Sequence, residues 1–486
     1  MLKAQLVKKS VSNPAIIYML SRYGTYIIQF VNSMFIAVYL GPYYLGIWGF
    51  INLIIGYIGQ INFGISQSVN VLVSVNKQDE AYSKKIINNG MSLMLILSLL
   101  IAVFFGFIYF YRIEMGEKYE FTQFILPVIL LTMISHITSY LSGFFRIYGH
   151  ILSIAVYQSI YPILVLLVIP FFRGIELVWA MLIVNIFSFL LALVYFILKS
   201  PVKLGIQFEW DTVKFIQKKG WHLFVYGASF YLIILTTNAF ISGNYEVEEF
   251  GYYTFSYSLA NVVLLLLNSI SFLVFPKMLN RFASSTNVEV QQLLSSVRAA
   301  FISLSHLLIH SVILLYPVFI YFFSQYESTV EVFRLTALTV VLYTNSFGYQ
   351  GYLMAKGEEK KIALVAFSAL IMNIVLCYIM INFFNVPFSM VILATMLTYF
   401  FYVHVSAKLG RKKLELKDDF INTLKDVFPI RMMLPFAVSI ILIFLEANNW
   451  LFVIPIILFA GLNFKDLRTV KDIVIRLIKN PNFVNI

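Results

Sequence analysis

The stretch NNGMSLMLILSLLIAVFFGFIYF, residues 88–110, decides the fold. It carries no charged side chain, and about 20 apolar residues at 1.5 Å per residue cross a hydrocarbon core of roughly 30 Å as a helix. Lys84 and Lys85 precede the stretch, and Arg112 and Glu114 follow it. Charged residues therefore bound an uninterrupted apolar segment, which is the pattern of a transmembrane helix.

Similar segments recur along the whole chain. Backbone polar groups in lipid must be satisfied within the segment, so each segment is expected to be a helix. We therefore predict an all-α polytopic membrane protein of about fourteen spans, at 14–39, 45–73, 88–110, 121–143, 151–171, 176–198, 221–242, 251–275, 299–323, 332–354, 361–384, 387–406, 432–448 and 450–463.

The composition is that of a membrane protein. Hydrophobic residues make up 60% of the 486 residues and charged residues only 12%, and the mean hydropathy is +0.85. A water-soluble fold would expose apolar patches of this extent and aggregate. The net charge of +12 is spread over short loops and tails and not gathered on one domain, so nucleic acid is not expected as a partner.

Basic residues lie in alternate gaps between the spans. The exceptions are Arg22, inside the first span, and four residues in the opposite gaps, namely Arg112, Lys118, Arg173 and Arg334. The positive-inside rule then places both termini in the cytoplasm, which agrees with an even number of spans. No small-residue cleavage site follows the basic N-terminus, so the first span is expected to be retained. Residues 1–13 are interpreted as an interfacial cytoplasmic segment, with a disordered basic tail as the alternative.

Two parts of the sequence echo each other. YLGPYYLGIWGF (39–50) and NYEVEEFGYYTF (244–255) each form an external turn, then a glycine, then an aromatic start to the next span. This echo predicts two parallel six-span halves, an architecture in which transporters place a site near the membrane midplane and alternate access by rocking. The predicted organisation is an N-lobe at 14–198, a cytoplasmic linker at 199–220, a C-lobe at 221–406, a basic linker at 407–431, two further spans at 432–463 and a cytoplasmic tail at 464–486.

Arg22 is the strongest candidate for a binding residue. It lies about a third of the way along the first span, where an Arg costs roughly 2.5–3.5 kcal/mol on insertion scales, so it is expected to face a cavity or a partner. Its planar guanidinium suits bidentate contact with phosphate. The alternatives are that Arg22 snorkels to the cytoplasmic surface or braces a neighbouring carbonyl.

Several motifs resemble one family. Ser21-Arg22, LGPYYLGIWGF (40–50), NFGIS (62–66) and the layout of six, six and two spans are similar to polysaccharide-export flippases of the multidrug/oligosaccharidyl-lipid/polysaccharide (MOP) superfamily, such as the O-antigen and capsule repeat-unit translocases. The resemblance implies movement of an undecaprenyl-diphosphate-linked oligosaccharide from the cytoplasmic to the outer leaflet of the bacterial inner membrane. It also implies a groove for the prenyl chain along spans thirteen and fourteen.

The resemblance to the lipid II flippases of this superfamily is partial. Their first span has a Ser-Arg pair that contributes to a cationic cavity, and Ser21-Arg22 matches it. Gly24, Thr25 and Tyr26 stand where those proteins carry further charges. The departure weakens a lipid II assignment, which stays an alternative.

Further polar side chains are predicted to lie inside spans. Interhelical hydrogen bonding is the usual role of such residues, and binding of sugar hydroxyls is the functional alternative. His306 and His310 are four residues apart on one helix face and are a candidate titrating pair. The predicted substrate-binding set is Ser21, Arg22, Gln29, Gln60, Asn62, His136, Asn238 and His310.

Enzymatic signatures are missing from the sequence. It contains no nucleophile elbow, phosphate-binding glycine loop or H-E-x-x-H motif, so no enzyme activity, metal or cofactor is predicted. A multidrug/cation antiporter would need an intramembrane carboxylate, and a membrane polymerase or glycosyltransferase a large external loop. The expected partners are the bilayer, the lipid-linked oligosaccharide, and a polysaccharide polymerase with its chain-length regulator.

Overall fold

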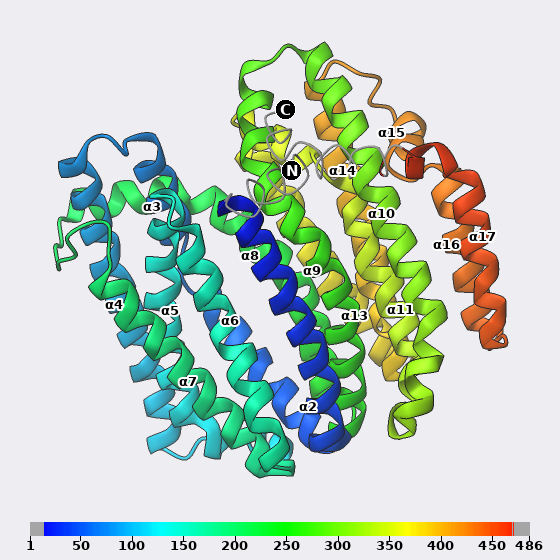
Figure 1. Ribbon diagram of the computed structural model, residues 1–486, viewed down its shortest axis with the longest axis horizontal. Helices are drawn as coiled ribbons and strands as arrows, with labels where there is room; N and C mark the ends of the chain where they lie inside the picture. The colour runs from blue at the N-terminus through cyan, green and yellow to red at the C-terminus, as the bar shows by residue number, and fades with distance from the viewer. Residues whose placement is uncertain (1–13, 469, 471–486) are drawn as a thin grey trace, which may run out of the picture. The chain divides into compact units, whose positions relative to one another are not determined.

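A computed structural model describes residues 14–468 and residue 470. The predicted interfacial segment at 1–13 and most of the predicted tail lie outside the described residues. The chain forms two compact units, one of residues 11–251 and one from Tyr252 onward, called here the N-terminal and C-terminal units. The described residues fold into helices joined by turns and short loops (Figure 1).

The helices of the N-terminal unit run side by side, with α2 packed on α6 and α7, and α5 between α4 and α7 (Figure 1). Their bounds are α2 (Pro14–Gly59), α3 (Ile65–Val75), α4 (Glu80–Phe110), α5 (Ile125–Ile147), α6 (Ile151–Val168), α7 (Gly174–Leu198) and α8 (Trp210–Asn244).

In the C-terminal unit α14 packs on α11 and α13, and the hairpin of α16 and α17 packs on α10 (Figure 1). The bounds are α9 (Val247–Ser284), which begins just before the boundary, α10 (Asn287–Phe322), α11 (Thr329–Leu342), α12 (Tyr349–Ala355), α13 (Glu359–Asn382), α14 (Ile392–Lys413), α15 (Phe420–Val427), α16 (Ile430–Phe444) and α17 (Val453–Leu462).

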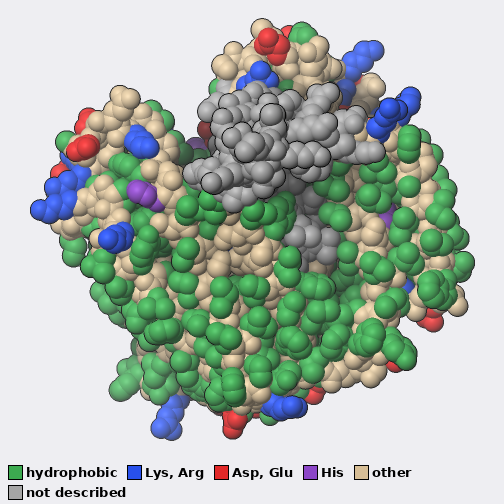
Figure 2. All heavy atoms as spheres, in the orientation of Figure 1, with side chains coloured by type: hydrophobic (Ala, Val, Ile, Leu, Met, Phe, Trp, Pro, Cys, Tyr) green, Lys and Arg blue, Asp and Glu red, His purple; other side chains and the backbone are tan. Residues whose placement is uncertain are grey.

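The fourteen predicted spans all fall on helices. Nine helices of the described residues are long and apolar enough to cross a membrane one by one. Of the other five spans, the eighth lies on α9, the second runs through the end of α2 and α3, the tenth through α11 and α12, and the last two are α16 and α17. In Figure 2 hydrophobic side chains cover the middle of the visible face of each unit, with charged side chains near the ends. The chain is a multi-pass membrane protein.

The turn between the first two spans has a local cause. Gly41 adopts φ 71° and ψ 171°, and Pro42 follows it. A positive φ is accessible to glycine without steric cost, and proline lacks the N–H that would continue the helix. The helical segments before and after Gly41 are therefore separate spans.

Glycines also allow close approach inside the N-terminal unit. A Cβ on Gly46 would lie 2.1 Å from the carbonyl oxygen of Val247, and one on Gly251 would lie 2.0 Å from the carbonyl oxygen of Pro42 and 3.1 Å from the Gly46 nitrogen. Gly46 and Gly251 are the glycines that the sequence echo relates. The start of the second span therefore packs backbone to backbone on the start of α9.

Candidate functional site

Arg22 lies on α2 and is half-buried. Its Nη2 donates a hydrogen bond of 2.6 Å to the Tyr26 hydroxyl, and the guanidinium sits 4.5 Å from the centroid of the same ring. The two residues are four apart, so they share one face of the helix. Tyr26 therefore holds the arginine both by its ring and by its hydroxyl.

Most of the hydrogen-bonding capacity of Arg22 is unused. A guanidinium has five N–H donors, and Tyr26 is its one hydrogen-bond partner among the described residues. Arg146 is exposed in the last turn of α5, and its charge acts on the Tyr18 hydroxyl, as the charge of Arg22 does.

The next face of α2 forms a polar seam with α6. The Thr25 hydroxyl lies 2.5 Å from that of Ser159, and Thr25 also donates to the carbonyl of Ser21. Asn32 Nδ2 donates to the Pro162 carbonyl at 2.7 Å. Three buried amide oxygens along this seam lack a hydrogen-bond partner among the described residues, namely those of Gln29, Asn32 and Gln158. Such acceptors can take hydrogen bonds from hydroxyl donors.

Three predicted residues surround the break between α2 and α3. The Asn62 side-chain oxygen accepts a hydrogen bond from the Gly64 N–H at 3.0 Å, and Gln60 lies in the same turn. His136 Nε2 lies 3.1 Å from the carbonyl oxygen of Ile58. Asn62 and His136 therefore each contact backbone at this break.

Asn238 lies on α8, apart from that break. The oxygen of its side chain is buried and has no partner among the described residues. It thus offers the same kind of acceptor as Gln29.

His306 and His310 lie on α10 in the C-terminal unit. His306 Nε2 is 2.9 Å from Asn345 Oδ1, and His310 Nδ1 is 3.3 Å from the Ser439 hydroxyl on α16. Both rings pack on Phe459 of α17, at centroid distances of 6.1 and 5.8 Å. The structure places the pair between α10 and the α16–α17 hairpin.

An ion-pair cluster of the C-terminal unit has no local signal in the sequence. Buried Arg298 donates from Nη1 to both oxygens of Asp426 at 3.2 Å and from Nη2 to the Asn345 carbonyl at 2.8 Å. Arg411 contacts the same carboxylate at 3.2 Å. Arg298 also lies 4.4 Å from the Tyr349 ring centroid, so it is paired with a carboxylate, a carbonyl and a ring, while its buried Nε lacks a partner among the described residues.

Comparisons with known proteins are informative at two levels. Residues 12–282 match the family model described as polysaccharide biosynthesis protein. The chain also resembles an inward-facing multidrug resistance MATE family transporter of the MOP superfamily, with a TM-score of 0.62 and 12% identity over 82% of this chain and 98% of that one.

An outward-facing structure with the same description gives a TM-score of 0.59 and 14% identity over 84% of this chain and 96% of that one. A MATE in the straight conformation gives a TM-score of 0.61 and 12% identity over 84% of this chain and 95% of that one. At these identities the likeness concerns the fold. No curated protein matches the sequence.

Proposed function

Since this chain belongs to the polysaccharide biosynthesis protein family and has the fold of MOP transporters, we propose that it is a flippase for undecaprenyl-diphosphate-linked oligosaccharides. It carries repeat units of O-antigen, capsule or exopolysaccharide from the cytoplasmic to the outer leaflet by alternating access. The family and the fold neighbours are transporters, and the prenyl-diphosphate sugar is the part that experiment must establish.

The observation that carries the proposal is the unsaturated guanidinium of Arg22. A diphosphate bears negative charge that cannot cross hydrocarbon alone, because desolvating an unpaired charge is very costly. Among the described residues Arg22 forms one hydrogen bond, to Tyr26, which leaves donors of its guanidinium for a ligand. A diphosphate oxygen that displaces the Tyr26 hydroxyl gains a charge-assisted hydrogen bond in its place.

The sugar part of the substrate needs acceptors and donors beside the cation. Gln29 lies two turns beyond Arg22 on α2, and its buried amide oxygen lacks a partner among the described residues. We assign it, with Ser21 and Asn238, to sugar hydroxyls. Gln60, Asn62, His136 and His310 stay in the proposed set as residues that the transport cycle would have to uncover.

The prenyl chain is assigned to the α16–α17 hairpin. The open end of the hairpin is closed by the ion pair of Arg431 with Asp466 at 2.7 Å, and Asp466 also accepts a hydrogen bond from Ser303 of α10 at 3.3 Å. At the turn of the hairpin, Arg334 of α11 donates to Asn449 at 2.6 Å. A hairpin held in this way keeps its apolar surface in place for an isoprenoid chain. Its exposed large hydrophobic residues include Leu434, Ile441, Phe444 and Ile457.

The remaining assignments follow from the charge pattern. We propose that the protein lies in the bacterial inner membrane with both termini in the cytoplasm, since the basic gaps are on that side. The lobes at 14–198 and 221–406 rock against each other, with the linkers at 199–220 and 407–431 in the cytoplasm. A polymerase and its chain-length regulator would receive the product on the outer side.

Glycolipid translocation in proteoliposomes tests the proposal. Undecaprenyl-diphosphate oligosaccharide is placed in the bilayer, and its exposure on the opposite leaflet is measured for the intact protein, Arg22→Ala and Arg22→Lys. We expect Arg22→Ala to lose movement and Arg22→Lys to keep part of it, because lysine keeps the charge without the bidentate geometry.

Arg173→Ala is the matched control. Arg173 also stacks on a tyrosine, 4.8 Å from the ring centroid of Tyr39, but it is exposed just before α7. Its removal should leave movement unchanged. Full movement by folded Arg22→Ala would remove the cationic role of Arg22, and no movement by the intact protein would overturn the flippase proposal in favour of drug antiport or polymerase activity.

A further inference from the structure

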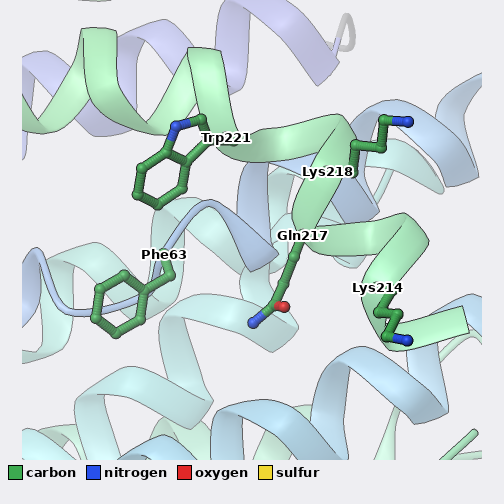
Figure 3. A pocket seen from close by; sticks show the side chains of 5 residues that line it. All are labelled: Phe63, Lys214, Gln217, Lys218 and Trp221. Atoms are coloured by element: carbon green, nitrogen blue, oxygen red, sulfur yellow. The ribbon is translucent and has the colours of Figure 1, made fainter. Parts of the chain in front are cut away.

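A pocket of about 370 Å³ opens at the start of α8, and five residues line it: Phe63, Lys214, Gln217, Lys218 and Trp221. Figure 3 shows that Phe63 comes from the turn before α3 and the other four side chains from α8. The two aromatic rings lie on one side, Lys214 lies on the other, and the Gln217 amide lies between them (Figure 3). The pocket therefore has an apolar wall and a cationic wall.

The cationic wall lacks an internal counter-charge. Lys214 lies 5.3 Å from the ring centroid of Trp210, and among the described residues neither Lys214 nor Lys218 forms an ion pair with a carboxylate. Glu209 is occupied by Lys85 at 2.5 Å, and this hydrogen bond lowers the pKa of the Glu209 carboxyl. The pocket is thus left positive.

The walls are held in place by backbone contacts. A Cβ on Gly220 would lie 2.3 Å from the Gly64 carbonyl oxygen, so the turn that carries Phe63 touches α8 directly. Phe63 and Gly64 both have positive φ, at 45° and 79°, and Asn62 caps the turn. The backbone around the pocket is therefore held in place without a ligand.

The chain before α8 is tied down as well. Asn88 accepts a hydrogen bond from the Gly205 N–H at 3.0 Å, and Asn89 accepts one from the Glu209 N–H at 2.6 Å. Both asparagines begin the apolar stretch of α4. The start of α8 is thereby fixed against the membrane end of another span.

Exposed aromatic residues place this segment at a membrane surface. Trp210, Phe215 and Trp221 are 59%, 45% and 49% exposed, and amphipathic rings of this kind prefer the level of the lipid headgroups. Lys84 and Lys85 lie on the same side of the membrane by the charge pattern. The pocket therefore meets the headgroups of the leaflet that faces the basic gaps.

We propose that this pocket binds the phosphate group of a membrane lipid, with Lys214 and Lys218 on the phosphate and Phe63 and Trp221 on the first carbons of the chain. Basic pockets at the cytoplasmic ends of spans suit such headgroups, and the volume fits a headgroup. The source is either a phospholipid of the bilayer or the diphosphate of the transported glycolipid. The site is distinct from Arg22, and only its glycolipid source rests on the proposed function.

Equilibrium binding to the purified full-length protein tests the site. Native mass spectrometry measures the affinity for phosphatidic acid in one arm and for undecaprenyl diphosphate in the other. We expect the double variant Lys214→Gln/Lys218→Gln to weaken binding by roughly tenfold or more in at least one arm. The arm that responds identifies the source of the phosphate.

Lys203→Gln/Lys219→Gln is the matched control, because it removes two charges from the same segment without touching the pocket lining. It should stay within about twofold of the intact protein. Equal affinities of the two double variants in both arms would overturn the site. The readout is binding, so failure of this site and failure of the Arg22 transport test are separate results.

Discussion

Arg22 in the N-terminal unit and Arg298 in the C-terminal unit share one feature and differ in another. Each guanidinium stacks on a tyrosine, at 4.5 Å from Tyr26 and 4.4 Å from Tyr349. Arg298 also has the Asp426 carboxylate and a backbone carbonyl, whereas Arg22 has the tyrosine hydroxyl alone among the described residues. An arginine paired with a buried carboxylate fixes structure, and one without a carboxylate partner among the described residues has donors left for a ligand.

The first way to sharpen this comparison is Asp426→Asn. It leaves Arg298 buried without its carboxylate, and breaking a buried pair in this way costs about 3–5 kcal/mol. We expect a large loss of thermal stability in detergent. Fluorescence-detected size exclusion after heating measures it. Asp418→Asn, in the same linker, should change little, and an equal Tm for the two variants would contradict a structural role for Arg298.

The pH dependence of stability follows from the same cluster. Burial raises the pKa of the Asp426 carboxyl, but Arg298, the Tyr349 hydroxyl and Arg411 together outweigh burial and hold the pKa below its ordinary value. A depressed pKa contributes stability above the unfolded-state pKa of about 3.9 that is lost as the pH falls through the folded value. The intact protein should lose stability below about pH 4, and Asp426→Asn should lack this part of the loss.

Arg22→Ala should show the opposite pattern, with transport lost and stability kept. Hydrogen bonds to charged groups contribute about 1.5–3 kcal/mol, so glycolipid movement per folded protein should fall by about 10- to 100-fold. The Tm should stay near that of the intact protein, because Arg22 pairs with no buried carboxylate in the part of the chain that the structure describes. A large fall in Tm would make Arg22 a structural residue like Arg298.

Gly46→Ala tests stability in the N-terminal unit without any change of charge. The added Cβ would meet the Val247 carbonyl, which is backbone and cannot move aside cheaply. Overpacking of this kind costs about 1–3 kcal/mol. Gly24→Ala is the control, since nothing lies within 4 Å of its Cβ position, and thermal unfolding of the two variants should separate them clearly.

The smallest effects are expected from the two tyrosines. Tyr349→Phe removes a hydroxyl that donates to Asp426 and should lower stability by about 1 kcal/mol. Tyr26→Phe removes the one partner of Arg22 among the described residues, yet glycolipid movement should stay within about twofold, because phosphate replaces that hydroxyl during binding. A Tyr26→Phe variant as inactive as Arg22→Ala would show that the hydroxyl itself takes part.

The site was accessible from the sequence only in part. Arg22 stood out because a charge inside an apolar run is rare, and its position needs no knowledge of its neighbours. Arg146 carried no such signal, because it lies at the end of a span with the other basic residues of the alternate gaps. The pocket residues Lys214 and Lys218 gave the same signal as every other basic loop residue, since Phe63 lies about 150 residues earlier.

The sequence by itself determined the helices, their order and the family resemblance. Bilayer thickness acts on each segment separately, so local hydropathy and flanking charge are sufficient for these features. Tertiary structure decided which polar side chains are satisfied. Arg298 meets a carboxylate 128 residues away and the histidine pair meets α16 and α17, whereas Arg22 has only Tyr26 as a hydrogen-bond partner among the described residues. Such pairing depends on packing between distant helices, which local composition does not encode.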